Sequence, residues 1–149
     1  MRIFIEQSGE KRKRNIFNKE TGVYERTVDF HVTYPYAYGY ILGTLASDGG
    51  ELDCYVITNK KLEACSIIEG EPIGMVEYFE DDQPDHKILI SLKGEDFKVD
   101  AEVKTKLLDF NARYYQDQPN RNTRVGNFLG KEEAVKEIEK SSALAQGSN

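Results

Sequence analysis

A change in hydrophobic periodicity near residue 100 constrains the fold of this 149-residue chain more than any other feature. Before that point, short segments rich in β-branched and aromatic residues alternate with turn signals, a pattern typical of β-strands. After it, apolar residues recur at helical spacing. Short strands followed by terminal helices predict an α+β fold that is mainly β, a compact β-barrel with helices packed outside.

The strand segments differ in how clearly they alternate. In ELDCYVIT, residues 51–58, Leu52, Cys54 and Val56 fall on one face and Asp53, Tyr55 and Ile57 on the other. The segment GEKRKR, residues 9–14, is interpreted as a turn. Besides 51–58, strands are expected at residues 2–6, 23–32 and 86–92, and as two short strands around EGEP within 66–80.

Two helices are expected in the last third of the chain. In residues 101–116, Val103, Leu107, Phe110 and Tyr114 form one helix face. A second helix is expected at 131–141, after a polar loop at 118–130. The whole chain, 1–149, is expected to form a single domain whose residues 141–149 are a frayed tail.

The overall charge excludes some classes of function. A formal net charge of −6 argues against a general nucleic-acid binder or a binder of anionic membranes. No apolar run approaches the ~20 residues that span a bilayer. Two cysteines, which we expect to be buried thiols, are too few for a disulfide framework, so a cytoplasmic location fits best.

Two groups of carboxylates point to a chemical role. Asp48, Glu51 and Asp53 lie within six residues of one another and repel unless a cation lies between them. A second acidic loop runs from Glu80 to Asp85 and is followed by Lys87. Oxygen ligands without histidine or cysteine favour Mg²⁺ or Mn²⁺ over zinc. By spacing alone, two solvated acidic loops remain an equal alternative.

Cations that could hold a phosphate beside such a metal are also present, namely Arg14, Arg26 and Lys87. Arg14 ends the basic run KRKR, which can be interpreted as a solvated turn or as an anion site. The tyrosines also allow two interpretations. Tyr38 is expected at the site, whereas Tyr36 and Tyr40 are expected mostly to pack.

Several motifs together resemble the soluble family I inorganic pyrophosphatases. The segment DGGELDC, residues 48–54, follows that family's Asp-Gly-Asp-Pro-x-Asp-type signature except at its third position. The preceding YPYAYGYILGTL is similar to the family's Tyr-Pro-x-x-Tyr-Gly-Tyr-Ile segment. PIGMVEYFEDDQPDHKILI and NARYYQ resemble later family segments in the same order. The resemblance covers about residues 3–140 and implies an OB-like barrel.

The resemblance implies a role for individual residues. Asp48, Asp53 and Asp85 match metal ligands, and Glu80 matches a further acidic ligand that is usually aspartate. Glu6 matches an acidic residue that acts through water, and Glu51 is a further candidate for such a role. The positions that match phosphate-binding residues are Arg14, Arg26, Tyr38, Lys87 and Tyr114, and the resemblance implies that Asp53, Lys87 and Tyr38 are catalytic.

Two positions depart from the family pattern. Gly50 stands where the family has an aspartate beside the attacking water, usually described as its base. Tyr115 replaces a phosphate-binding lysine, and either Arg121 or Arg124 could supply the cation instead.

The implied function is Mg²⁺-dependent hydrolysis of inorganic pyrophosphate, with Mn²⁺ as a possible substitute, in a homo-oligomer. The departures keep open an alternative, a pyrophosphatase-like protein of weakened or lost activity that binds metal-phosphate or nucleotide. A nucleic-acid-binding barrel with tyrosine stacking platforms is a third interpretation, which the acidic balance disfavours.

Overall fold

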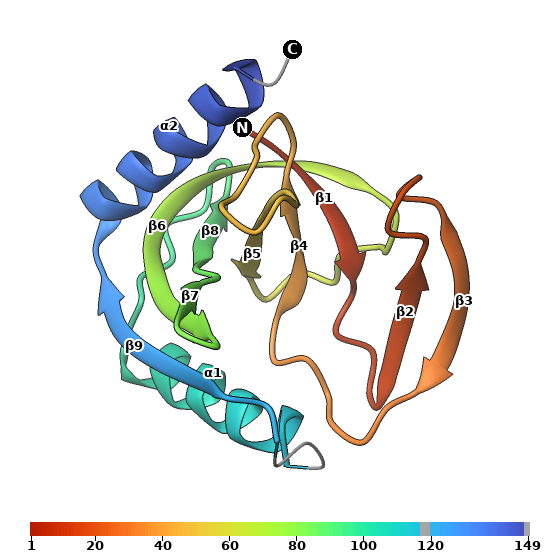
Figure 1. Ribbon diagram of the computed structural model, residues 1–149. Coiled ribbons are helices and arrows are strands. Elements are labelled where there is room, and N and C mark those ends of the chain that lie inside the picture. The colour runs from red at the N-terminus through yellow and green to blue at the C-terminus, as the bar shows by residue number, and fades with distance from the viewer. Residues whose placement is uncertain (117–119, 148–149) are drawn as a thin grey trace.

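A computed structural model describes residues 1–116 and 120–147, and a curled sheet that returns to its first strand dominates it (Figure 1). The order β1-β4-β5-β8-β6 is closed by a further pairing between β6 and β1. The sheet is therefore ring-like. Its five ring strands are β1 (Arg2–Gln7), β4 (Ala37–Ile41), β5 (Leu52–Ile57), β8 (Lys87–Leu92) and β6 (Ile67–Glu80).

The remaining elements surround this ring (Figure 1). The short strand β7 and strand β9 pair with β6, and β2 and β3 form a separate two-stranded sheet. Both helices lie outside the ring, and the mainly β fold with two helices confirms the expected class and is compatible with an OB-like fold. These elements are β2 (Lys13–Phe17), β3 (Tyr24–Asp29), β7 (Gln83–Pro84), β9 (Thr123–Leu129), α1 (Ala101–Tyr114) and α2 (Lys131–Gly147).

Each face of the sheet buries its own apolar cluster. Leu52, Cys54 and Val56 of β5 belong to one cluster, which Ala134 of α2 joins. Tyr55 and Ile57 face the other cluster. The alternation expected for β5 is thereby confirmed, and it leaves Asp53 on the same face as Tyr55. The second cluster also contains Val103, Leu107 and Phe110, the residues that α1 buries as its periodicity predicts.

A very close approach between β1 and β4 requires a glycine. Ile5 is paired with Gly39, and a Cβ atom at Gly39 would lie 1.8 Å from the carbonyl oxygen of Phe4. No side chain larger than hydrogen fits at that distance. The glycine between Tyr38 and Tyr40 thus lets the two strands meet, and Ala37, Gly39 and Ile41 are the buried positions of β4.

The two short strands expected around EGEP are in fact one strand, because β6 continues through Pro72. Pro72 lies opposite Ile90, and the register between β6 and β8 shifts between Pro72 and Gly74. A proline is tolerated in a sheet where a bulge interrupts the ladder. The proline therefore marks an irregularity within a long strand and does not end it.

Further expectations were wrong because distant partners order segments that look irregular in sequence. The expected turn 9–14 overlaps β2, which pairs with β3, and the expected loop 118–130 contains β9, which pairs with β6; residues 118–119 lie outside the described part. Of residues 141–149, expected to fray, 141–147 belong to α2, where the carbonyl of Ser141 accepts a hydrogen bond from the Leu45 N–H at 2.9 Å; residues 148–149 lie outside the described part. Cys54 is buried as expected, whereas Cys65 is exposed. Within residues 1–116 and 120–147, no helix is both long and apolar enough to cross a membrane.

Candidate functional site

A polar cavity of about 710 Å³ brings together nearly all of the predicted site residues. Its walls come from the first two strands, from β4, β5 and β8, from the loop at 48–51 and from the end of α1. Acidic and basic side chains from distant parts of the chain therefore share one space. The predicted residues that line it are Glu6, Arg14, Tyr38, Asp48, Glu51, Asp53, Glu80, Asp85, Lys87 and Tyr114.

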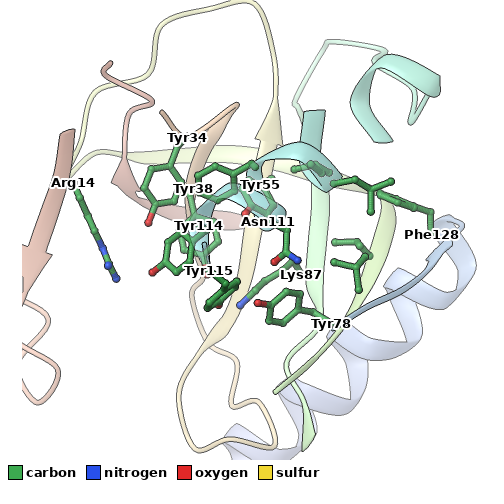
Figure 2. Close-up of a pocket in the computed structure, with 15 residues that line it drawn as sticks. Arg14, Tyr34, Tyr38, Tyr55, Tyr78, Lys87, Asn111, Tyr114, Tyr115 and Phe128 are labelled. Carbon is green, nitrogen blue, oxygen red and sulfur yellow. The ribbon is translucent and has the colours of Figure 1, made fainter. Parts of the chain in front are cut away.

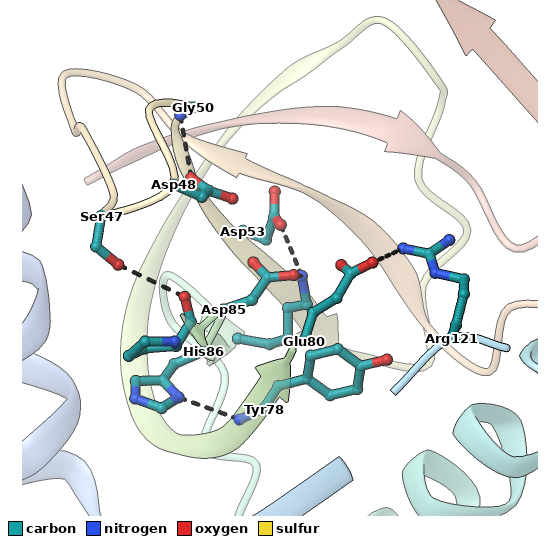
Figure 3. Close-up of polar contacts among 11 residues, drawn as sticks. Ser47, Asp48, Gly50, Asp53, Tyr78, Glu80, Asp85, His86 and Arg121 are labelled. Atoms are coloured by element: carbon teal, nitrogen blue, oxygen red, sulfur yellow. Dashed lines mark hydrogen bonds and ion pairs between the residues drawn. The ribbon is translucent and has the colours of Figure 1, made fainter. Parts of the chain in front are cut away.

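Lys87 lies between two aspartates of this cavity, Asp53 and Asp85, which Figure 3 labels. Its Nζ is 2.7 Å from Asp53 Oδ2 and 3.1 Å from Asp85 Oδ2, and its side chain is only 12% exposed. Burial lowers the pKa of Lys87, but Tyr38, Asp53 and Asp85 together raise it well above its ordinary value. Burial raises the pKa of Asp85, and Lys87 opposes that rise. The lysine therefore stays charged.

The tight loop before β5 orients Asp48. The N–H of Gly50 donates to Asp48 Oδ1 at 3.0 Å, and the Ala46 N–H donates to the Gly50 carbonyl at 2.7 Å. The left-handed residue of this loop is Gly49, with φ of 91°. Gly50 is not left-handed, and a Cβ atom there would meet only Asp48 Oδ1 at 3.7 Å. The backbone at Gly50 thus accepts other side chains.

Of the two candidate arginines near Tyr115, only Arg121 lines the cavity. Arg121 forms an ion pair with Glu80, and its Cζ lies 5.1 Å from the centroid of the Tyr115 ring. Arg124 lies over the Phe79 ring instead, 3.9 Å from its centroid. The structure thus separates two arginines that spacing could not distinguish. It also gives Glu80 a cationic partner.

The two arginines expected to hold phosphate are placed differently. Arg14 lies beside Tyr114, with Cζ 5.6 Å from that ring's centroid, and it lines the cavity (Figure 2). Arg26 is paired in register with Ile16 on the exposed strand β3, where its Nη1 lies 3.3 Å from Glu25 Oε2. It does not line the cavity. The structure therefore does not bring Arg26 to the other predicted residues.

Two positioning residues were missed from the sequence. The buried Gln7 side chain donates to the Asn15 carbonyl at 2.9 Å and accepts from the Asn15 N–H at 2.8 Å. The Asn15 side chain in turn donates to the Glu6 carbonyl at 2.8 Å. These bonds connect the β2–β3 sheet to β1, and Arg14 of β2 and Glu6 of β1 both line the cavity. A glutamine next to a predicted site residue was the only signal, and periodicity does not single it out.

The carboxylates fit a hard metal ion by their chemistry more than by their present arrangement. Asp48, Asp53 and Asp85 line one cavity, and oxygen-only donors suit Mg²⁺ or Mn²⁺. Among the residues that the structure describes, no three acidic, histidine or cysteine side chains already form a group that could hold a metal. Lys87 bonds to Asp53 and Asp85, so its ammonium group takes the place between them.

Comparisons with known proteins identify relatives over nearly the whole chain. A family model described as inorganic pyrophosphatase matches residues 3–146. An inorganic pyrophosphatase of Nanoarchaeum equitans is 36% identical, covering 72% of this chain and 74% of its own length. One from Geobacillus stearothermophilus is 30% identical, covering 91% of this chain and 88% of its own length.

Solved structures share the fold. The inorganic pyrophosphatase of Helicobacter pylori superposes with a TM-score of 0.84 at 24% identity, covering 98% of this chain and 93% of that one. The one from Thermus thermophilus gives a TM-score of 0.83 at 21% identity, covering 98% of this chain and 91% of that one.

The half-buried Glu6 generates a prediction about stability. Burial and, to a smaller extent, the carboxylates of Asp53 and Glu51 raise the pKa of Glu6 from 4.5 to about 7, although Lys87 and Arg14 act to lower it. The folded protein thus holds this proton more tightly than the unfolded chain. In metal-free buffer, the stability from Glu6 should be complete below pH 4.5 and lost as the pH rises through about 7.

At about 1.4 kcal/mol per pKa unit, the unfolding free energy should fall by up to about 3 kcal/mol over this pH range. Glu6→Gln should remove this pH dependence, so the unfolding free energy measured by urea denaturation should fall less between pH 5 and 7.5. Glu63→Gln makes the same change at an exposed glutamate and serves as the control. Identical slopes for all three proteins would contradict the protonation of Glu6.

Proposed function

The chain belongs to the inorganic pyrophosphatase family, and from this premise we propose that it hydrolyses inorganic pyrophosphate to two phosphate ions in the polar cavity. The observation that carries the proposal is the arrangement of Lys87 between Asp53 and Asp85 in a cavity that Arg14 also lines. Carboxylates for a metal and cations for a phosphate then stand side by side, which phosphoryl transfer to water requires.

We propose Mg²⁺ as the metal, with Mn²⁺ as a substitute. Asp48, Asp53 and Asp85 would hold it, and Glu80 would contribute once it exchanges its partner Arg121 for the ion. When bound, the ion neutralises phosphate charge and lowers the pKa of water.

The cationic side chains would hold and orient the substrate. Arg14 lies against Tyr114, which limits how its planar guanidinium can turn. Lys87 lies over the Tyr38 ring, with Nζ 5.7 Å from its centroid. These groups would grip the phosphoryl oxygens and stabilise the charge that develops on the leaving phosphate.

The proton of the attacking water needs an acceptor, and Gly50 offers none. Of the carboxylates that line the cavity, Glu51 and Asp53 follow Gly50 most closely in sequence and are the candidates to accept it. General-base catalysis typically contributes about 10²–10⁴-fold, so its weakening lowers the rate without abolishing turnover.

We propose that Arg121 supplies the cation missing at Tyr115. It lies over that tyrosine ring and lines the cavity. Arg26, which resemblance alone assigned to substrate binding, is held by Glu25 on an exposed strand and has at most an indirect part. An inactive, phosphate-sensing protein is the less favoured alternative, because the relatives named above are enzymes by name. From family membership we also propose a homo-oligomer, which sedimentation velocity would test.

The first test is phosphate release from pyrophosphate. We expect turnover with Mg²⁺, weaker turnover with Mn²⁺, and none in EDTA. Asp53→Asn should lower kcat at least about 100-fold, because an amide is a poor ligand for a hard cation and carries no charge. The variant's circular dichroism and Mg²⁺ affinity should be measured on the same sample. A folded Asp53→Asn protein with unchanged turnover would overturn the site.

The second test compares two neighbouring arginines. Arg121→Ala should raise KM or lower kcat at least about 10-fold, the usual scale for a lost charge-assisted contact. Arg124→Ala removes the same charge from the same segment but outside the cavity, so its kinetics should stay within about 2-fold of the unsubstituted protein. Equal effects of the two substitutions would mean that Arg121 acts only through the overall charge.

The third test restores the missing carboxylate. Gly50→Asp should raise kcat by up to about 100-fold, because neither backbone strain nor a steric clash opposes the side chain. Repulsion by Asp48 would raise the new group's pKa and reduce the gain. Gly50→Asn has nearly the same shape without a base and is the matched control. If both variants fold, bind Mg²⁺ equally and have the same kcat, another group activates the water.

A further inference from the structure

A second, smaller cavity of about 120 Å³ opens beside the polar one (Figure 2). It lies between α1 and the sheet, and it extends to Phe128 on β9. The two cavities meet along a shared wall that contains both a cation from β2 and one from β8. The residues that line both are Arg14, Tyr34, Tyr38, Lys87, Tyr114 and Tyr115.

The inner walls of the small cavity are apolar and largely aromatic. Tyr55, Phe110 and Phe128 contribute rings, and Val76 and Leu107 contribute aliphatic side chains. An apolar cavity of about 150 Å³ in another protein holds one benzene molecule. The present cavity, at about 120 Å³, is slightly smaller. It therefore accommodates one six-membered ring with only a small displacement of its walls.

One side chain that lines this cavity, Tyr78, has a buried hydroxyl without a well-formed hydrogen bond. Tyr78 is 6% exposed, and its hydroxyl makes no well-formed hydrogen bond to any described residue, although the Tyr115 and Thr123 side chains are close enough to affect its pKa. Burial raises the pKa of Tyr78, so the group remains a neutral donor. In Figure 2 its ring points toward Lys87, and the Asn111 side chain enters the same space. A buried hydroxyl without a partner is unfavourable, and an acceptor on a ligand would relieve this.

We propose that the small cavity binds a single aromatic ring of an organic phosphate whose phosphate group occupies the adjoining polar cavity. The ring would lie among the aromatic walls and accept a hydrogen bond from Tyr78. Arg14 and Lys87 stand at the junction, so one phosphate monoester can reach both cavities at once. The inference rests on the proposed function, because the phosphate end uses the pyrophosphate site.

The experiment compares three small phosphate monoesters by isothermal titration calorimetry in Mg²⁺ buffer without pyrophosphate. Methyl phosphate has no ring, phenyl phosphate has one, and pyridin-3-yl phosphate has a ring of the same size with an acceptor nitrogen. We expect both aromatic esters to bind at least about 10-fold tighter than methyl phosphate, which corresponds to about 1.4 kcal/mol. Aromatic esters that bind no tighter than methyl phosphate would overturn the inference.

Two variants test where the ring binds. Asn111→Phe fills the small cavity and should reduce the affinity for phenyl phosphate to that for methyl phosphate, while methyl phosphate affinity stays unchanged. Tyr78→Phe removes only the unpartnered hydroxyl, so the protein should melt at the same or a higher temperature. It should weaken pyridin-3-yl phosphate binding about 3–10-fold, the usual range for one hydrogen bond, and leave phenyl phosphate unaffected.

Failure of this inference is distinguishable from failure of the proposed function. If inorganic phosphate and methyl phosphate bind but the ring adds nothing, the small cavity holds only solvent and the pyrophosphate site stands. If none of the phosphates binds, both fail. Tighter aromatic binding that survives Asn111→Phe would place the ring elsewhere and overturn the assignment to this cavity.

Discussion

A positive charge enclosed between two negative ones is the interaction on which this site depends. Lys87 is nearly buried, and its ammonium group contacts both Asp53 and Asp85. Removing one partner from a buried ion pair leaves an uncompensated charge and is strongly destabilising. The parallel pairing of β5 with β8 places the lysine beside Asp53, and the short link between β7 and β8 supplies Asp85. The arrangement of these elements therefore brings the three charged groups together as well as packing the apolar core.

The same triad means that the proposed metal binding would require a rearrangement. Lys87 occupies the space between two of the carboxylates that we propose would hold the metal. Glu80 is likewise engaged, by Arg121. Each lysine or arginine that a metal displaces from a carboxylate becomes available to a phosphate oxygen. Metal and substrate are thus expected to favour each other's binding, because both exchange the same set of ion pairs.

Local sequence patterns predicted the parts of this structure that local physics determines. The alternation in β5 and the helical stripe of Val103, Leu107 and Phe110 both follow from which face is buried, and both are visible in sequence. Strands β2 and β9 were missed because their hydrogen-bonding partners, and not their composition, make them strands. The positions of Arg26 and Arg121 could not be predicted for a related reason. A long side chain can pair with any carboxylate within its reach, and the folded chain determines which carboxylate that is. Arg26 pairs with Glu25, and Arg121 pairs with Glu80.

The closure of the ring between β1 and β6 also determines when the protein can assemble during its synthesis. Arg2 is paired with Glu69, so the first strand lacks this partner until almost half of the chain has left the ribosome. Lys87 emerges later still, after Asp48 and Asp53. Until then, the nascent chain carries these carboxylates without the ammonium group that later separates Asp53 from Asp85. Long-range pairings of this kind make folding slow and leave strand edges exposed meanwhile. A growing chain that stalls before β8 would therefore hold an open sheet in which the edge of β5 that β8 later covers is unpaired.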